Sequence, residues 1–417
     1  MTPTSNRKTI AIFCLAQTLA QLGAFTFPAL LPVFFGVWSL SHTEAGWLSG
    51  VFFGAYSLSV PLLVTLTDRV DARRIYMWAV VLTTLSHLGM AFAATGFWSA
   101  FLFRVLAGVG WAGTYMVGLK ALADRVEGAS QSRAVAFHAA SIGISGSLSF
   151  MIAGVVTTWF DWQVAFMAGA LGTLGALCVA AAGFPRSPPV RRKTPNTRLL
   201  DFRPVLKNRS VMAYAIGYCV HTWEMFVVRS WVVTFLVFTA AQPGEQVNFL
   251  VPTVVAMLME LVGTATSVLG NEMAVRFGRQ RWIMSVMLAS MLIATIVGFS
   301  SAWGYGVATA ICLLYNAFIY ADSSSLTAGT VGNADPESRG AALAVHAMLG
   351  YGGGFVGPLV MGLILDALGG ESVLNWGIGF AHLALIMVIG PVALKLLKPG
   401  DLEGDRPSRS SNRSRNF

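Results

Sequence analysis

The feature that most constrains this chain is a dense cluster of charges at residues 68–74, which separates two long apolar runs at residues 45–67 and 75–94. A helix of roughly 20 apolar residues is long enough to cross a bilayer. Because the link between the runs is so short, we expect the two helices to be antiparallel neighbours. The cluster therefore predicts a tight hairpin at a membrane surface.

The same arrangement occurs twice along the chain. A second charged cluster occurs at residues 275–281. Arg276 in this cluster corresponds to Arg69 in the first one, 207 residues earlier. Arg133 and Arg339, each at the start of another apolar run, are 206 residues apart. Two markers with nearly the same separation predict a duplicated membrane domain.

The composition excludes a soluble domain. Charged residues make up 11% of the sequence and hydrophobic residues 55%, whereas soluble domains carry about 25% charged residues. We therefore expect an all-α polytopic membrane protein. Apolar runs bounded by charge, glycine or proline predict twelve transmembrane helices. Their expected limits are residues 9–36, 45–67, 75–94, 97–123, 134–158, 162–184, 210–240, 249–270, 282–301, 303–328, 341–365 and 373–397.

The repeat divides the twelve helices into two pseudo-symmetric six-helix bundles, at residues 1–184 and 210–397. Residues 185–209 are rich in proline, lysine and arginine, which predicts a basic cytoplasmic linker. Residues 398–417 are rich in serine, arginine and asparagine and predict a disordered cytoplasmic tail.

The net charge of +9 is explained by orientation in the membrane rather than by nucleic-acid binding. Of the 28 lysines and arginines, all but Arg104, Lys120 and Arg229 fall in segments that can lie on one side of the membrane. This positive-inside pattern predicts that both termini are cytoplasmic in a plasma membrane, in bacteria the inner membrane. We expect a monomer whose partners are the lipid bilayer and a small-molecule solute, with no nucleic acid.

Motifs for catalysis and cofactors are missing. The four cysteines lie in apolar runs without metal-ligand spacing, so we expect no metal site. No P-loop, His-Glu-x-x-His or Gly-x-Ser-x-Gly motif occurs, which argues against ATP as energy source and against an enzyme with a catalytic site. We expect no cofactor and an ion gradient, most simply of protons, as the driving force.

Six plus six spans, a basic central linker and charged loops after spans two and eight resemble the major facilitator superfamily. The first loop matches the family pattern at Asp68, Arg69 and Arg73, with Val64 where the family has glycine. Span four matches at Arg104-x-x-x-Gly-x-Gly. The second loop has Val275 where the pattern has aspartate.

The resemblance implies two bundles working by alternating access, with spans one, four, seven and ten lining a central cavity. It also implies that charges at the helix ends form a cytoplasmic gate, although the basic residues could serve only to set topology. The expected gate residues are Asp68, Arg69, Arg73, Arg74, Arg276, Gly278 and Arg279.

Ionisable residues at membrane depth are costly and usually functional. The candidates for solute or proton binding are Arg104, Glu224, Arg229, Glu260 and Asp322, together with His221, one turn before Glu224. Glu224 and Arg229 are five positions apart and do not share a helix face, whereas His221 and Glu224 do. Cavity arginines would favour an anionic solute, and the acids would carry a proton. Alternatively, these groups form ion pairs that only hold the bundle together.

Several uncharged positions have two interpretations. Gln17 and Gln21 share a face of span one and would bind solute or their own neighbours. Asn316 belongs to a polar stripe in span ten that we expect to line the cavity. The Gly357-Pro358 pair is a hinge if the helix bends there, or else one part of a close glycine contact.

These patterns together predict a secondary active transporter for proton-coupled uptake, or symport, of a small organic anion. Two alternatives stay open. One is efflux of drugs or metabolites by proton antiport, and the other is a sensor of the same fold that does not transport.

Overall fold

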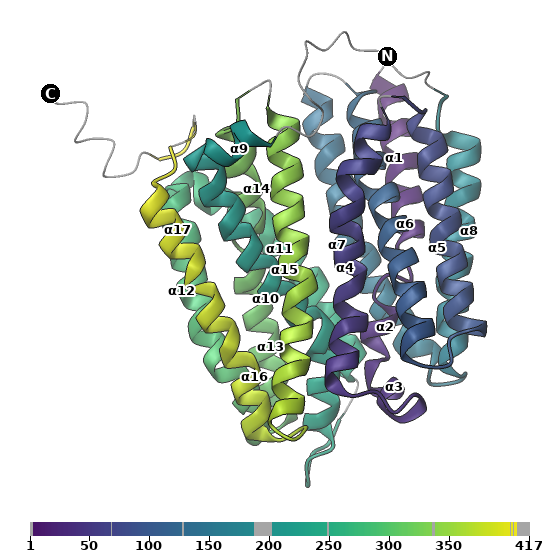
Figure 1. The fold of residues 1–417 in the computed structure, drawn as a ribbon, viewed down its shortest axis with the longest axis vertical. Helices are drawn as coiled ribbons and strands as arrows, with labels where there is room; N and C mark the ends of the chain where they lie inside the picture. Colours follow the sequence, from purple (N-terminus) through teal and green to yellow (C-terminus); the bar gives the residue numbers. More distant parts are fainter. Residues whose placement is uncertain are drawn as a thin grey trace, which may run out of the picture. The chain divides into compact units, whose positions relative to one another are not determined.

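The computed structural model describes residues 3–67, 69–126, 129–186, 202–247, 250–335, 338–400, 402 and 404–406. Every regular element in these ranges is helical (Figure 1). Close contacts divide the chain into two compact units. Unit 1 comprises Met1–Leu199 with Ala256–Leu261, and unit 2 comprises Leu200–Val255 with Val262–Phe417.

Unit 1 is a bundle in which α6 packs against both α4 and α5, and α8 packs against α5 and α1. A capping box begins α4, since the Ser41 side chain accepts from the Glu44 amide and Glu44 accepts from the Ser41 amide. The helices of this unit are α1 (Pro3–Ala20), α2 (Thr26–Ala29), α3 (Leu31–Val37), α4 (His42–Leu66), α5 (Ala72–Phe92), α6 (Phe97–Ala123), α7 (Ala129–Val156) and α8 (Trp162–Gly183).

Unit 2 is organised around α10, which packs against α13, α14, α15 and α17 and is buried along most of its length. Its elements are α9 (Arg203–Lys207), α10 (Arg209–Ala240), α11 (Pro252–Phe277), α12 (Arg279–Val297), the 3-10 helix η1 (Gly298–Trp303), α13 (Tyr305–Tyr320), α14 (Ser323–Gly332), α15 (Arg339–Ala367), α16 (Val373–Met387) and α17 (Ile389–Leu397).

Eleven helical segments in the described part of the chain are long and apolar enough to cross a membrane, which confirms the predicted fold class. The first predicted span, residues 9–36, is not one continuous helix. It is interrupted after Ala20 and divided among α1, α2 and α3. Pro28 and Pro32 cannot donate backbone hydrogen bonds, which favours an interruption in this segment.

Two other predicted spans are also interrupted. The span at residues 303–328 consists of α13 and α14, with Asp322 at the junction between them. The span at residues 373–397 consists of α16 and α17, which meet at Val388. Apolar runs predict where a chain crosses a membrane, but they do not show where the helix inside a run breaks.

The linker and the tail are described in part. Residues 202–209 contain α9 and the start of α10, while residues 187–201 lie outside the described residues. Disorder from residue 398 stays a prediction, while the structure describes two hydrogen bonds at the start of the tail. The Gly400 amide donates to Ser210 Oγ at 3.1 Å and the Arg406 amide donates to the Val275 carbonyl at 3.0 Å. Residues 407–417 lie outside the described residues.

The glycines of α15 form a close contact with α10. A Cβ atom on Gly353 would lie 2.3 Å from the Cys219 carbonyl oxygen, and one on Gly357 would lie 2.9 Å from that of Trp223. The helix continues through Pro358, whose carbonyl accepts a hydrogen bond from Trp231 Nε1 at 3.0 Å. Close packing therefore explains these glycines, and a hinge at Gly357-Pro358 stays a prediction.

A methyl group at this contact should destabilise the protein. We expect Gly353→Ala to cost about 1–3 kcal/mol, as overpacking commonly does, because the new Cβ collides with the backbone of α10. Gly352→Ala is the matched control, since nothing lies within 4 Å of a Cβ at that position. Thermal unfolding of the purified protein in detergent measures the difference, and equal unfolding temperatures would contradict the close contact.

Candidate functional site

Arg104 is a buried cation in the interior of unit 1. Its side chain leaves α6, and the residue is 5% exposed. Nε donates to the Leu48 carbonyl at 2.9 Å, and the guanidinium carbon lies 4.5 Å from the centre of the Phe52 ring and 5.1 Å from that of Phe27. No carboxylate pairs with it among the residues that the structure describes. A buried charge without a counter-charge is costly.

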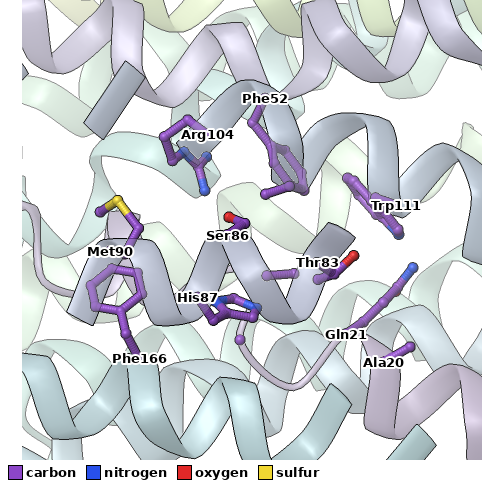
Figure 2. A pocket seen from close by; sticks show the side chains of 13 residues that line it. Ala20, Gln21, Phe52, Thr83, Ser86, His87, Met90, Arg104, Trp111 and Phe166 are labelled. Carbon is purple, nitrogen blue, oxygen red and sulfur yellow. The ribbon is translucent and has the colours of Figure 1, made fainter. Parts of the chain in front are cut away.

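The Arg104 side chain lines a small cavity inside unit 1 (Figure 2). The guanidinium and the Phe52 ring point into the same space, with Ser86 and His87 across from them. The space open to a water-sized sphere is about 20 Å³, which is enough for a water molecule and too small for a solute. Its walls come from α1 and the turn after it, α4, α5, α6 and α8, and include Gln21, Thr83, Met90, Trp111 and Phe166.

Two polar side chains at this cavity have donors or acceptors to spare. His87 Nε2 and Gln21 Nε2 are buried and have no hydrogen-bond partner among the described residues. His87 packs against the backbone of Gly23, in the break between α1 and α2. A Cβ atom on Gly23 would lie 2.4 Å from the imidazole ring. Glycine is therefore required where the backbone passes the ring.

The two glutamines of span one differ in their surroundings, and neither interpretation, solute binding or bonds to neighbouring residues, fits both of them. Gln21 Oε1 accepts a hydrogen bond from Ser145 Oγ at 3.4 Å. Both amide atoms of Gln17 are buried and have no partner within the described part of the chain. The structure thus places Gln21 in the wall of the cavity that Arg104 also lines and leaves Gln17 off this wall.

Unit 2 contains a buried acidic cluster on the face of α10 that His221 and Glu224 share. His221 Nδ1 lies 2.8 Å from Asp322 Oδ1 at the α13–α14 junction, an ion-pair contact rather than an aligned hydrogen bond. Glu224 Oε1 accepts from Ser290 Oγ and Tyr315 Oη, both at 2.7 Å. Each of the three ionisable residues is at most 1% exposed.

This cluster has the chemistry of a proton-binding site. Aspartate, glutamate and histidine are the side chains that commonly carry protons inside membrane transporters. Glu224 Oε2 has no partner in the described residues, so this oxygen can accept a proton without losing a hydrogen bond. The arrangement can therefore hold and release a proton.

Arg229 lies on another face of α10 and has different partners. It donates to the Tyr320 hydroxyl, and its guanidinium carbon lies 5.5 Å from the Phe226 ring and 5.8 Å from the Tyr320 ring. The prediction that Glu224 and Arg229 do not share a helix face is confirmed.

Asn316 and Glu260 are also buried. Asn316 lies one turn before Tyr320 on α13, and both side chains approach Gly263 of α11, where a Cβ would lie within 3.0 Å of each. Glu260 lies on α11, three residues before that glycine. Their part in solute or proton binding stays a prediction.

Three residues of these sites, His87, Ser290 and Tyr315, are not among the predicted site residues. Tyr315 precedes Asp322 by seven residues, a spacing that puts two residues of a helix on one face, so periodicity could have found it. Ser290 is one of several hydroxyl residues in an apolar run, with Ser285 and Thr295, and offers no local signal. His87 is a histidine in an apolar run, but its place at the cavity depends on the break in a different helix.

The first charged hairpin is held by hydrogen bonds to the start of α5 and to α8. Asp71 begins α5 by accepting a hydrogen bond from the Arg73 amide at 3.0 Å, and Arg73 Nη2 donates to the Ala181 carbonyl at 2.5 Å. Arg69 and Arg74 are exposed. Asp68, also predicted to belong to the gate, lies outside the described residues.

Arg125 lies in the turn that follows α6 and is partly buried there. Partial burial lowers the pKa of the Arg125 guanidinium, and the carboxylates of Asp71 and Asp124 act in the opposite direction. Its Nη1 and Nη2 donate to the carbonyls of Ala121 and Pro185 at 2.6 and 3.0 Å. Arg125 therefore ties the end of α6 to the segment that directly follows α8.

The second charged hairpin differs from the first. Gly278 separates α11 from α12 with φ of +93°, a conformation that favours glycine. Arg276 is exposed, with its guanidinium carbon 5.9 Å from the Phe277 ring. Arg279 is buried and binds Asp405 of the tail, with N–O distances of 2.8 and 2.9 Å.

The family model of the Major Facilitator Superfamily matches residues 13–355 of the chain. The protein belongs to the Major Facilitator Superfamily. This facilitator is 22% identical over 391 residues to a hexuronate transporter of Bacillus subtilis, covering 88% of this chain and 90% of that one. A probable 4-methylmuconolactone transporter of Cupriavidus pinatubonensis is 26% identical over 157 residues, covering 37% and 36%.

Solved structures show the same fold. A bacterial homolog of the human lysosomal transporter Spinster, inward-facing and occupied, superposes with a TM-score of 0.72 at 16% identity, covering 95% of this chain and 96% of that one. The nucleoside transporter NupG superposes with a TM-score of 0.71 at 16% identity, covering 94% and 98%. This facilitator is thus an integral membrane protein of a transporter family.

Proposed function

We propose that this facilitator is a secondary active transporter that takes up a small organic anion together with protons by alternating access. The observation that carries the proposal is Arg104, a buried guanidinium at a cavity without a carboxylate partner among the described residues. Phe27 and Phe52 hold the cation in place, yet neither neutralises its charge. An anionic solute would do so.

A carboxylate suits the geometry of this site. Guanidinium binds planar anions through two parallel hydrogen bonds, and Nε of Arg104 is already used by Leu48, so the terminal nitrogens are left for the solute. His87 Nε2 and Gln21 Nε2 would add hydrogen bonds on the same cavity wall. The name of the hexuronate transporter, with a carboxylate-bearing solute, supports this class.

Solute entry requires movement, because the cavity now has room only for water. The wall formed by span one is interrupted between α1 and α2, next to Gln21. Interrupted helices are common at the binding sites of secondary transporters, where a helix break frees polar groups for solute. We propose that this part of unit 1 opens when the transporter changes state.

Protons would be carried by the cluster of His221, Glu224 and Asp322. Moving one negative charge into a cell against a potential of 100 mV costs about 2.3 kcal/mol. A proton that enters with the anion cancels this cost and adds the energy of its gradient. Unit 2 supplies two buried carboxyl groups for the proton, whereas unit 1 supplies the cation for the anion.

The placement of lysine and arginine supports a bacterial inner membrane with both termini in the cytoplasm. The relatives are named as transporters of small solutes, which supports a small molecule as the binding partner of this chain. We propose that one copy of the chain is sufficient for transport.

Replacement of Arg104 should strongly reduce anion uptake. We expect Arg104→Gln to lower uptake of labelled glucuronate, or of whichever small carboxylate is transported, by about 10–100-fold, as loss of hydrogen bonds to a charged group does. Lys395→Gln is the control, because Lys395 is exposed near the end of α17. Uptake into proteoliposomes is the measurement. Unchanged uptake by Arg104→Gln, or accumulation of lipophilic cations instead of anions, would contradict the proposal.

Replacement of Glu224 should separate transport from its driving force. In Glu224→Gln the side chain keeps its size and its hydrogen bonds to Ser290 and Tyr315 but cannot take up a proton. We expect this variant to exchange labelled for unlabelled carboxylate across the membrane and to lose accumulation driven by an inward proton gradient. Glu272→Gln, at an exposed position of α11, should keep both. Gradient-driven accumulation by Glu224→Gln would argue against the assigned role.

A further inference from the structure

The start of the C-terminal tail lies across one end of unit 2. We call the described residues 398–400, 402 and 404–406 the strap; it follows α17, drawn in yellow (Figure 1). Its partners belong to α10, to α14 and the residue after it, and to the hairpin between α11 and α12. The polar composition of this segment predicts disorder, so specific interactions must hold the strap against unit 2.

The strongest contact is the ion pair of Asp405 with Arg279. The two side chains are 3% and 6% exposed. Arg279 Nε and Nη2 donate to the two carboxylate oxygens at 2.8 and 2.9 Å, the bidentate geometry that makes such pairs strong. Nη1 donates to Asn271 Oδ1 at 2.9 Å and to the Ser325 carbonyl at 3.3 Å. The guanidinium thereby joins the strap to α11, α12 and α14.

Three further contacts support the strap at other points. The Arg406 amide donates to the Val275 carbonyl, and the Gly400 amide donates to Ser210 Oγ. Leu402 packs against the end of α14, where a Cβ on Gly332 would lie 2.6 Å from the leucine side chain. The strap is therefore docked along its length, and the glycine is what makes room for it.

The hairpin that the strap reaches lacks an acid of its own. In the first charged cluster, Asp68 directly precedes Arg69, whereas in the second cluster Val275 precedes Arg276. The Arg406 amide binds the carbonyl of that same valine, and the next residue back, Asp405, places a carboxylate on Arg279 of the hairpin.

We propose that the strap is a conformational device that supplies the carboxylate missing from the second hairpin. While it is docked, Asp405 neutralises Arg279 and holds the neighbouring ends of α11, α12 and α14 together. When it leaves, Arg279 becomes a buried cation without its counter-charge, which is strongly unfavourable. The hairpin then loosens and the ends of these helices separate.

Hydrogen–deuterium exchange of the full-length protein in detergent tests this directly. Asp405→Asn should increase deuterium uptake in peptides covering the α11–α12 hairpin and the start of α14, while the rest of unit 2 is unchanged. Arg406→Ala is the matched control, since the Arg406 side chain is exposed and only its amide binds the hairpin. It should exchange like the unsubstituted protein.

A second variant guards against a general loss of folding in Asp405→Asn. Gly332→Val keeps both charged residues, Asp405 and Arg279, but puts a side chain where Leu402 packs, so it should undock the strap and give the same local increase. Unchanged exchange at the hairpin in both variants would overturn the proposal, as would an equal increase in Arg406→Ala. The measurement needs no solute, so its result is independent of whether the chain transports an anion.

Discussion

The structure depends on how charge is balanced in an interior that contains little water. Each unit buries ionisable groups, and each solves the problem differently. Unit 1 places Arg104 between two aromatic rings, which hold the cation without neutralising it. Unit 2 surrounds Glu224 with donors and pairs His221 with Asp322. Because an isolated buried charge is so costly, the unbalanced cation is the group most in need of a ligand.

Breaks in transmembrane helices put polar groups at both sites. The first span ends its regular helix just before Gln21, which faces the Arg104 cavity. The tenth span is interrupted at Asp322, which meets His221. A helix break frees backbone groups and changes the direction of the side chains around it. The duplicated architecture thus gives each unit one interrupted helix beside its charged residues, with a cation in one unit and acids in the other.

The long apolar runs and the repeat of the charged hairpins are enough to predict the fold, because a bilayer accepts few backbone conformations. They also identify Arg104, Glu224 and Asp322, since charge in an apolar run is conspicuous. The interruptions and the partners are not predictable in this way. Ser290 and Tyr315 bind Glu224 from other helices, and Asp405 reaches a hairpin 126 residues away. Such contacts depend on tertiary packing, which local composition does not encode.

We infer that the unbalanced guanidinium of Arg104 selects an anion. The most informative measurement is equilibrium binding to the purified protein, detected as a rise in its unfolding temperature. Carboxylates such as glucuronate are each compared with a neutral counterpart of the same size, such as glucose. We expect stabilisation by at least one carboxylate and none by its neutral counterpart, with the effect lost in Arg104→Gln. Equal stabilisation by the neutral solutes, or stabilisation that survives in Arg104→Gln, would contradict it.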